Sequence, residues 1–468
     1  MQAYTKVGKE HLLYFENTIG KDFVKYDEEN LSKYGKDETE DLIFCPEVVL
    51  KPRTTNEVSS ILQYCNQNKI PVTPRGAGTG LSGGALPVFG GVGLSMERFN
   101  SILEIDERNL QATVEPGVIN QVFQEAVKEK KLFYPPDPAS YGSCFLGGNI
   151  AHCSGGPKAV KYGVTRDYVL NLEMVLANGE VCWTGANVLK NSTGYNLTHL
   201  MVGSEGTLGV ITKIVFKLIP YPEHTVVMLV PFFSAENACA SVSEVFKAGI
   251  IPSGMEFMER DAIDRVLNFM DTPPVEIKNE HMAHLLIELD GNNMDVLMHD
   301  AERISEVMMN FNCDEIFFAE NDAQKQNLWM MRRKVAESVK ANSIYKEEDT
   351  VVPRAELPKL LSGVKEIGQR YGFKSVCYGH AGDGNLHVNI IKGDMSDEAW
   401  NTKLEEGIRE IFHLCVSLGG TISGEHGIGL VQKKYMNIAL NATREILQRG
   451  IKELFDPNNI LNPGKILD

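Results

Sequence analysis

The chain carries the run Pro74-Arg75-Gly76-Ala77-Gly78-Thr79-Gly80-Leu81-Ser82-Gly83-Gly84 directly after a predicted strand, residues 70–74. The pattern of residues 45–52 is typical of another short strand. Between the two strands, Thr54 and Glu57 have the spacing of a capping box at the start of a helix. Apolar residues then follow at helical spacing, namely Val58, Ile61, Leu62 and Cys65. The sequence therefore predicts a strand–helix–strand unit that ends in a loop suited to wrapping backbone N–H groups around a diphosphate.

The glycine-rich loop contains a formal G-x-G-x-x-G pattern at Gly78, Gly80 and Gly83, and Glu97 lies near the acidic position of a dinucleotide-binding fold. In that fold the loop opens a helix. Here Pro87 and a further group of glycines follow within a few residues, and they interrupt a helix. We therefore reject the dinucleotide-binding fold and keep the prediction of a phosphate-binding loop.

Two further glycine-rich segments lie downstream. The first runs from Pro135-Pro136-Asp137-Pro138 to residues 147–156, and the second covers residues 193–212. Tight turns are sufficient to explain any one such cluster. Three clusters in this order are hard to explain as turns alone, and the two downstream segments are interpreted as partners of the first loop.

The bulk composition excludes several classes of protein. The 468 residues are too many for one ordinary core, so two or three structural units are expected. A formal net charge of −16 argues against nucleic-acid binding and against docking on anionic lipid. The nine cysteines include no Cys-x-x-Cys pair, which disfavours a disulfide framework or an iron–sulfur cluster. We find no signal-peptide pattern and no apolar run of membrane-spanning length, so a cytoplasmic protein is expected.

The prolines of Ile219-Pro220-Tyr221-Pro222 mark a predicted domain boundary. Beyond it, strand-like runs alternate with amphipathic helices such as residues 295–311 and 397–417, which predicts an α+β unit with an antiparallel sheet and helices on one face. The turn-rich tail, residues 455–465, is expected to be tied down on another domain. The predicted division is an N-terminal helical segment, a cofactor domain, a cap domain and a returning C-terminal segment, at residues 1–40, 41–220, 221–420 and 421–468.

A group of imidazoles and carboxylates lies in the stretches 379–387 (GHAGDGNLH) and 423–427 (SGEHG). Residues 375–380 and 386–391 are predicted to form a hairpin, which brings His380 and His387 together. With Glu425 they make a ligand set for one divalent metal ion, Zn, Fe(II) or Mn. His426 must point away from Glu425 on an extended segment, which frees it for acid–base work. A single histidine is more often structural, but this combination favours metal-assisted chemistry on a small oxygen-bearing substrate.

The chain resembles the FAD-linked 2-hydroxyacid dehydrogenases, which include D-lactate dehydrogenase, a glycolate oxidase subunit and D-2-hydroxyglutarate dehydrogenase. These belong to the vanillyl-alcohol-oxidase-type (PCMH-type) flavoproteins. The resemblance runs from about residue 40 to the C-terminus and rests on six motifs in order: PRGAGTGLSGG, PPDP with GGNIA and SGG, TGYNLTHLMVGSEGTLGVIT, GHAGDGNLHVN, SGEHGIG and FDPNNILNPGK. It implies an α+β architecture with a two-subdomain PCMH-type FAD-binding domain, an α+β cap domain with an antiparallel sheet, and a C-terminal segment that returns to the FAD domain.

The resemblance also implies cofactor contacts. Residues 75–82 would cradle the pyrophosphate of FAD, and residues 137–155 and 205–211 would line the rest. Some relatives bind FAD covalently through a histidine of the pyrophosphate loop, but this loop has none, so noncovalent FAD is expected. The predicted FAD-binding residues are Arg75, Gly76, Ala77, Gly78, Thr79, Gly80, Leu81, Ser82, Asp137, Ser143, Gly147, Gly148, Asn149, Ala151, Ser154, Gly155, Glu205, Gly209, Ile211 and Asn462.

By the same resemblance, Arg332 and Lys346 would bind the substrate carboxylate, with Arg333 as a rival for the first position. Asn385 and Asn389 are candidates for contact with substrate or ligands, and Asp383 is interpreted as a turn residue. The expected reaction is oxidation of a D-2-hydroxy acid to the 2-oxo acid, with D-lactate favoured over glycolate and D-2-hydroxyglutarate. The metal would lower the pKa of the hydroxyl, His426 would take its proton, and FAD would take the hydride.

The electrons must leave the flavin, and this chain has no ligands for an iron–sulfur cluster and no Cys-x-x-Cys-His haem motif. A separate acceptor is therefore expected, such as an electron-transfer flavoprotein, an iron–sulfur subunit or a membrane-bound quinone-linked partner. Two alternatives remain: an oxidase that reduces dioxygen, and an electron-relay subunit of a larger complex without substrate chemistry of its own.

Overall fold

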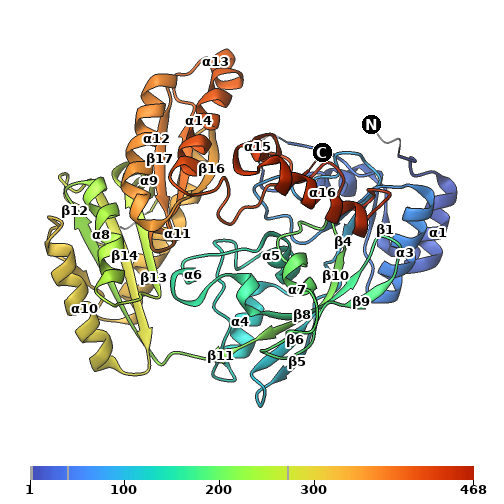
Figure 1. The fold of residues 1–468 in the computed structure, drawn as a ribbon, viewed down its shortest axis with the longest axis horizontal. Coiled ribbons are helices and arrows are strands. Elements are labelled where there is room, and N and C mark those ends of the chain that lie inside the picture. The colour runs from blue at the N-terminus through green and yellow to red at the C-terminus, as the bar shows by residue number, and fades with distance from the viewer. Residues whose placement is uncertain (1–3, 40–41, 271–273, 468) are drawn as a thin grey trace. The chain divides into compact units, whose positions relative to one another are not determined.

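The computed structural model describes residues 4–39, 42–270 and 274–467, and the chain forms two compact units. The first unit comprises Met1–Gly155, Val164–Tyr221 and Glu425–Asp468, and the second comprises Gly156–Gly163 and Pro222–Gly424 (Figure 1). The chain thus leaves the first unit at Tyr221, within the proline-rich stretch where the sequence predicts a boundary. The boundary predicted between residues 40 and 41 lies outside the described residues.

The predicted strand–helix–strand unit is confirmed, and its two strands lie in the first sheet of the first unit. The strand order of this sheet is β1-β2-β4-β3, with β2 and β3 both parallel to β4. Helix α3 connects β2 to β3 and buries Val58, Ile61, Leu62 and Cys65, the apolar face expected from the sequence. The bounds in this part are α1 (Lys9–Ile19), β1 (Val24–Lys25), α2 (Glu28–Tyr34), β2 (Val48–Leu50), α3 (Thr55–Asn68), β3 (Val72–Arg75) and β4 (Val92–Ser95).

Helix α3 begins with the predicted capping box. The Thr54 hydroxyl accepts a hydrogen bond from the Glu57 N–H at 3.2 Å, and the Glu57 carboxylate accepts one from the Thr54 N–H at 3.3 Å. We expect Thr54→Ala to lower the free energy of unfolding by about 1 kcal/mol, because a helix N–H loses its acceptor. The measurement is chemical denaturation, with Asn56→Ala, at a nearby exposed position of the first helical turn, as the control. Equal effects of the two substitutions would contradict the role of the cap.

The second sheet of the first unit is antiparallel, with the order β5-β6-β10-β8-β9. Short helices and loops between its strands carry the other two glycine-rich segments. The bounds are β5 (Ile102–Asp106), β6 (Gln111–Val114), α4 (Asn120–Lys128), β7 (Leu132–Phe133), α5 (Leu146–His152), β8 (Val169–Val175), β9 (Val181–Trp183), α7 (Leu197–Met201), β10 (Val210–Lys217) and β11 (Ile219–Pro220).

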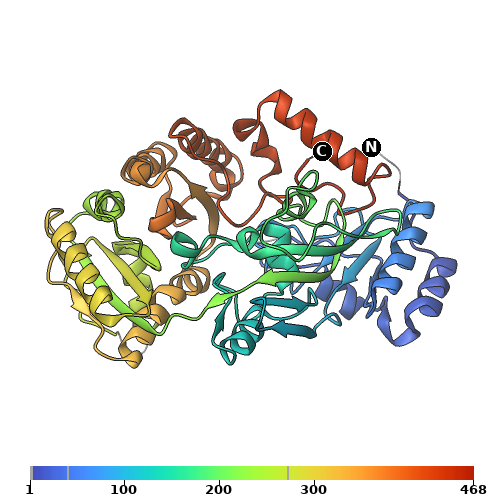
Figure 2. The ribbon, with the colours of Figure 1, turned by 60° about the horizontal axis from the view of Figure 1, so that its bottom comes forward.

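The C-terminal segment of the first unit contains α15 (Met436–Ala439) and α16 (Ala442–Phe455) and is drawn in red in Figure 2. Beyond α16, the tail lies along β3: the Val72 N–H donates to the Ile460 carbonyl at 2.7 Å, and the Asn462 N–H donates to the Val72 carbonyl at 2.8 Å. Ile460 and Leu461 are fully buried in the same core as α3. The prediction that the tail is tied down is confirmed.

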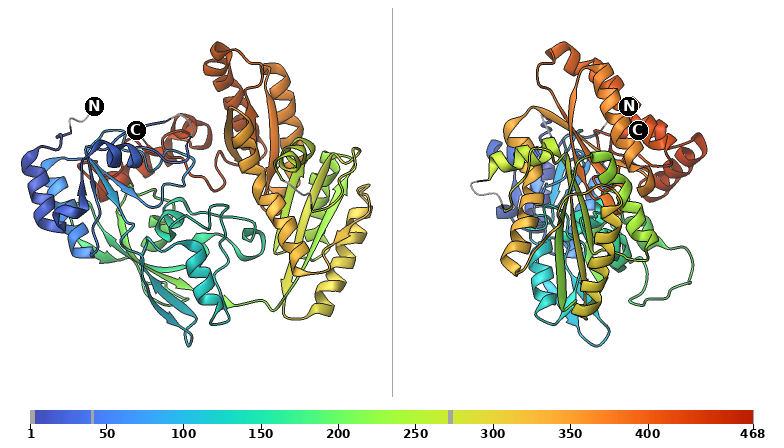
Figure 3. Two further views of the ribbon diagram at one scale, coloured as in Figure 1. Left: turned by 180° about the vertical axis from the view of Figure 1, so that it is seen from behind. Right: turned by 90° about the vertical axis from the view of Figure 1, so that its left-hand side faces the viewer.

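The second unit is built on a seven-stranded sheet with the order β15-β12-β14-β13-β17-β18-β16, in which every pairing is antiparallel. The elements that follow residue 222 in this unit are drawn in green to orange in Figure 3. The bounds are α6 (Ala159–Tyr162), β12 (His224–Phe232), α8 (Ala235–Lys247), β13 (Gly254–Glu259), α9 (Arg260–Phe269), β14 (Ala283–Gly291), α10 (Met294–Met309), β15 (Phe317–Phe318), α11 (Asp322–Asn342), β16 (Tyr345–Val351), α12 (Leu357–Tyr371), β17 (Lys374–Gly379), β18 (Asn385–Ile391), α13 (Asp397–Asn401) and α14 (Lys403–Ser417).

The antiparallel sheet is confirmed, but the prediction of helices on one face only is wrong. Helices α9 and α11 share an apolar cluster with Met258 and Tyr378 on one face. On the other face, Lys365 of α12 donates to Glu259 and Ser375, whose side chains alternate with those of Met258 and Tyr378 along the strands. The central strands are buried along almost their whole length, so both faces need a covering layer.

Candidate functional site

The predicted histidine hairpin is present as β17 and β18. Tyr378 pairs with His387 across the two strands, and His380 follows one residue after β17 ends. The rings of His380 and His387 lie 5.3 Å apart between centroids, at an angle of 84°. Gly384 in the turn has φ +77°, and a Cβ atom there would collide with the Val352 carbonyl. The turn therefore requires glycine at this position, and the hairpin brings the two imidazoles together.

A carboxylate that the sequence analysis missed holds one of these histidines. Both oxygens of Glu256, on β13, lie within hydrogen-bond distance of His380 Nδ1, at 2.8 and 2.9 Å. The Arg332 Nη2 atom lies 2.7 Å from Glu256 Oε2. Burial acts to raise the pKa of Glu256, but the neighbouring His380 and Arg332 outweigh it, so its pKa lies below the usual value. The sequence does contain a signal for this contact. Glu256 lies inside the strand run Gly254-Met255-Glu256-Phe257-Met258, where an unpaired charge is unfavourable, so a charged partner is expected.

His387 lies among side chains of β16, the edge strand beside it. Its Nδ1 atom is 3.6 Å from Glu347 and 3.8 Å from Asp349. Asp349 accepts a hydrogen bond from Asn385 Nδ2 at 2.7 Å. The Asn385 amide nitrogen, predicted as a contact for substrate or ligands, therefore binds strand β16. These two carboxylates were also missed, because only the strand register shows that they share a face with His387.

The structure separates the predicted substrate-binding residues. Arg332 is 6% exposed, and its Nε–H has no hydrogen-bond partner among the described residues. Asn389 is 1% exposed and lies on the same strand face as His387. Lys346 pairs with Ile390 and so points to the opposite face of the sheet, where its ammonium lies 5.5 Å from the Trp400 ring. Arg333, the rival of Arg332, is exposed on α11.

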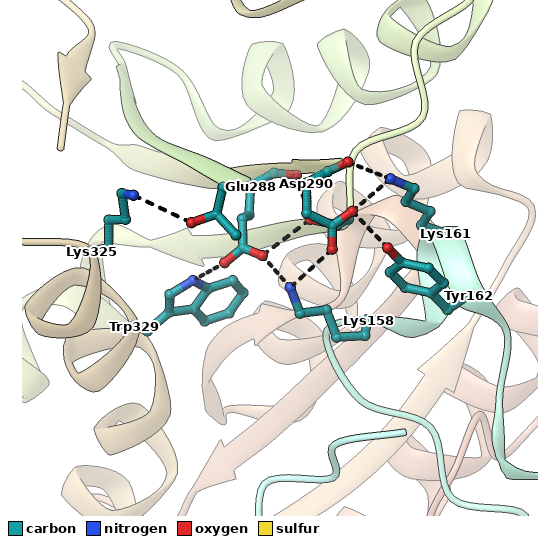
Figure 4. A network of polar contacts seen from close by, with 9 residues as sticks. Lys158, Lys161, Tyr162, Glu288, Asp290, Lys325 and Trp329 are labelled. Atoms are coloured by element: carbon teal, nitrogen blue, oxygen red, sulfur yellow. Dashed lines mark hydrogen bonds and ion pairs between the residues drawn. The ribbon is translucent and has the colours of Figure 1, made fainter. Parts of the chain in front are cut away.

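A network of charges holds residues 156–163 on the same unit (Figure 4). Lys158 makes an ion pair with Glu288 and lies 3.9 Å from Asp290. Lys161 and Tyr162 donate to Asp290 at 2.6 and 2.8 Å. Trp329 Nε1 also donates to Glu288, at 2.6 Å. The segment that directly follows the predicted FAD-lining residues is therefore fixed on β14, which the sequence did not indicate.

In the first unit the three glycine-rich segments come together. A Cβ atom on Gly76 would lie 3.8 Å from Gly148, and the Glu205 N–H donates to the Ala151 carbonyl at 2.9 Å. The Asn462 amide donates to the carbonyls of Gly84 and Glu205 at 2.9 and 2.8 Å. These contacts bring together the predicted pyrophosphate loop, the second and third glycine-rich segments and the C-terminal tail in one part of the first unit.

The geometry of the glycine-rich loop fits a diphosphate. Among the described residues, the backbone N–H groups of residues 76–83 donate no hydrogen bond to the protein, and the buried Ser82 hydroxyl has no partner there either. Consecutive N–H groups of this kind form an anion-binding concavity. Arg75, in contrast, lies over the Tyr34 ring at 5.4 Å and is buried.

Glu205, a predicted FAD-lining residue, binds the segment that carries the predicted base. Its two carboxylate oxygens accept hydrogen bonds from the N–H groups of Ile428 and Gly429, both at 2.7 Å. In the same unit, Glu425 Oε2 accepts from the Gly155 N–H at 3.2 Å. Residues 425–429, with His426 among them, are thus held by defined contacts at both ends.

Of the helices in the described ranges, none combines the length and the apolar character needed to cross a membrane.

Comparison with known proteins agrees with these features. Residues 46–185 match the family described as "FAD binding domain", and residues 221–466 match the family described as "FAD linked oxidases, C-terminal domain". The chain is 39% identical to the glycolate oxidase subunit GlcD of Bacillus subtilis, over 94% of this chain and 93% of the relative. It is 38% identical to a D-lactate dehydrogenase of Anaerostipes hadrus, with coverages of 90% and 89%.

A D-2-hydroxyglutarate dehydrogenase of Stutzerimonas stutzeri is 31% identical, over 94% of this chain and 95% of that one. Among solved structures, p-cresol methylhydroxylase superposes with a TM-score of 0.78 at 18% identity, covering 100% of this chain and 99% of the other. The latter likeness confirms the PCMH-type fold. The chain belongs to the FAD-linked oxidase family, as an FAD-binding oxidoreductase of the D-lactate, glycolate and D-2-hydroxyglutarate dehydrogenase type.

Proposed function

We propose that this chain oxidises a D-2-hydroxy acid to the 2-oxo acid with FAD as the electron acceptor and one divalent metal ion at the site, and that D-lactate is the substrate. The observation that carries the proposal is the buried face of the second unit, where two imidazoles converge beside Arg332, whose Nε–H has no partner in the described part of the chain. Imidazole pairs bind divalent cations, and a guanidinium binds carboxylates. A 2-hydroxy acid carries a hydroxyl next to a carboxylate, so it can bind the cation and the guanidinium at the same time.

We assign the metal ion to His380, His387 and Glu425. The fit of the two imidazoles supports this assignment: Glu256 occupies Nδ1 of His380 and leaves Nε2 as the ligand atom. Glu425 follows directly on Gly424, whose N–H donates to the Asp349 carbonyl at 3.2 Å, and Asp349 pairs with His387 in the sheet. A Zn, Fe(II) or Mn ion in such a site acts as a Lewis acid toward the substrate hydroxyl.

The residues of this chain have separate tasks in the reaction. Arg332 binds the substrate carboxylate and Asn389 contacts the substrate. His426 takes the hydroxyl proton, and the α-carbon loses its hydride, so the product is the 2-oxo acid. Bound FAD supplies the two-electron acceptor, and the glycine-rich loop holds its diphosphate without a covalent bond. Lys346 has no part in this assignment, because it points to the other face of the sheet.

The electrons taken up by FAD would then pass to a separate protein acceptor. Relatives of this chain are named as subunits of glycolate oxidase, which supports a protein acceptor such as an electron-transfer flavoprotein or an iron–sulfur subunit. Glycolate and D-2-hydroxyglutarate are the alternative substrates, because relatives of similar identity carry those names.

The test is anaerobic reduction of the flavin. We expect D-lactate to bleach the absorbance of the oxidised flavin, L-lactate to leave it unchanged, and prior treatment with a chelator to abolish the bleaching until the metal is restored. Bleaching only by glycolate or by D-2-hydroxyglutarate would replace the substrate. Bleaching that survives complete metal removal would contradict the assignment of the metal ion.

A further inference from the structure

Glu256 is an unusual residue for the centre of a sheet. It lies in the middle of β13, its side chain is 0% exposed, and β14 and β17 flank the strand. A carboxylate in such a place is strongly unfavourable unless charged or hydrogen-bonding partners surround it. Its partners are His380 and Arg332, both of which have roles in the proposed reaction.

The contact with His380 fixes the chemistry of the ring. Both carboxylate oxygens face Nδ1, at 2.8 and 2.9 Å, so Nδ1 carries the proton and Nε2 presents its lone pair. A carboxylate behind a histidine in this way fixes the tautomer and the ring orientation, and it raises the basicity of the other nitrogen.

The contact with Arg332 fixes the guanidinium. Nη2 lies 2.7 Å from Glu256 Oε2, and the guanidinium carbon lies 5.0 Å from the centroid of the Tyr378 ring. One edge of the planar group is thus held by the carboxylate and its face by the aromatic ring. The Nε–H, without a partner among the described residues, remains for a ligand.

We infer that Glu256 is a positioning residue that orients the metal ligand His380 and the carboxylate-binding Arg332 at the same time, and so couples metal binding to substrate recognition. The inference rests on the proposed function. A single carboxylate has two oxygens for these two tasks. The amide of a glutamine has only one acceptor oxygen and carries no charge. Glu256→Gln must therefore lose the hydrogen bond with His380 or the attraction to the Arg332 guanidinium.

The same strand provides a matched control. Glu259 is also buried, at 6% exposure, but its side chain points to the other face, where it accepts hydrogen bonds from Lys365 at 2.7 Å and from the Cys377 N–H at 2.6 Å. Glu259→Gln therefore perturbs a buried charge of the same sheet and touches no group of the site. An effect that comes from destabilising the sheet will appear in both variants.

The test is a titration with Mn²⁺ of the flavin-loaded protein from which metal has been removed. Electron paramagnetic resonance measures the concentration of the free ion. We expect Glu256→Gln to raise the Mn²⁺ dissociation constant by about 10–100-fold and to raise the KM for D-lactate by more than it lowers kcat. We expect Glu259→Gln to leave both at the wild-type values. If Glu256→Gln does not fold, Glu256→Asp, which keeps the charge but is one methylene shorter, is measured in its place.

Unchanged Mn²⁺ affinity and KM in Glu256→Gln would overturn the inference, and so would equal losses in the two glutamine variants. His387→Ala separates this result from failure of the proposed function. If His387→Ala loses Mn²⁺ binding while Glu256→Gln keeps it, the metal assignment stands and only the role of Glu256 falls. If the wild-type protein and His387→Ala behave alike, the metal assignment itself falls, and the inference falls with it.

Discussion

Replacement of His426 by alanine is expected to lower the rate of flavin reduction by D-lactate by about 10²–10⁴-fold, the range typical of a lost general base. The contacts on either side of His426 should survive the substitution, because they use the Glu425 carboxylate and the backbone N–H groups of Ile428 and Gly429. FAD content and Mn²⁺ affinity should therefore stay at the wild-type values. The measurement is stopped-flow absorbance of the flavin under anaerobic conditions.

The control for this variant is His299→Ala, which removes an exposed histidine of α10 and should leave the rate unchanged. Added imidazole should restore part of the rate in His426→Ala, because a small base can enter the space left by the side chain. A wild-type rate in His426→Ala would show that another group accepts the hydroxyl proton.

Replacement of Lys158 by methionine is expected to destabilise the second unit by about 3–5 kcal/mol, since it leaves a buried carboxylate without its cation. The Glu288 and Asp290 side chains are 8% and 1% exposed. Trp329 and Ser253 would still donate hydrogen bonds to Glu288, but neither carries a charge. The measurement is the denaturant midpoint, followed by Trp329 fluorescence as a local probe.

Two controls test the physical reason. In the double variant with Glu288→Gln, most of the stability should return, because no unpaired buried charge remains. Lys247→Ala breaks the pair with Glu244, where the lysine side chain is 71% exposed, and should cost less than about 1 kcal/mol. If Lys158→Met is no more destabilising than Lys247→Ala, the network of Figure 4 does not hold residues 156–163 in place.

Much of the fold could be predicted because its signals are local. The capping box of Thr54 and Glu57, the apolar spacing of α3 and the glycines around Gly384 act within a few residues of one another. The hairpin that brings the rings of His380 and His387 together is local as well. The candidate metal ligands, the candidate base and the cofactor segments could therefore be named from the order of residues alone.

Other features depend on the register of strands that are distant in sequence. Glu256 lies 124 residues from His380, and no local pattern connects the two. Lys346 and Glu347 are neighbours in the chain, yet the period of two in a strand sends them to opposite faces, and only the pairing with β18 decides which one lies beside His387.

The sequence by itself determined the family, the FAD fold and the candidate residues of the reaction, because glycines, histidines and capping residues constrain the backbone close to where they stand. The tertiary structure alone decided which charges are neutralised and by which partner. Burial makes an isolated charge very unfavourable, so Glu256 and Glu288 require partners that only the packed sheet supplies. Those long-range pairs connect His380, the proposed metal ligand, to Arg332 and fix residues 156–163 on β14.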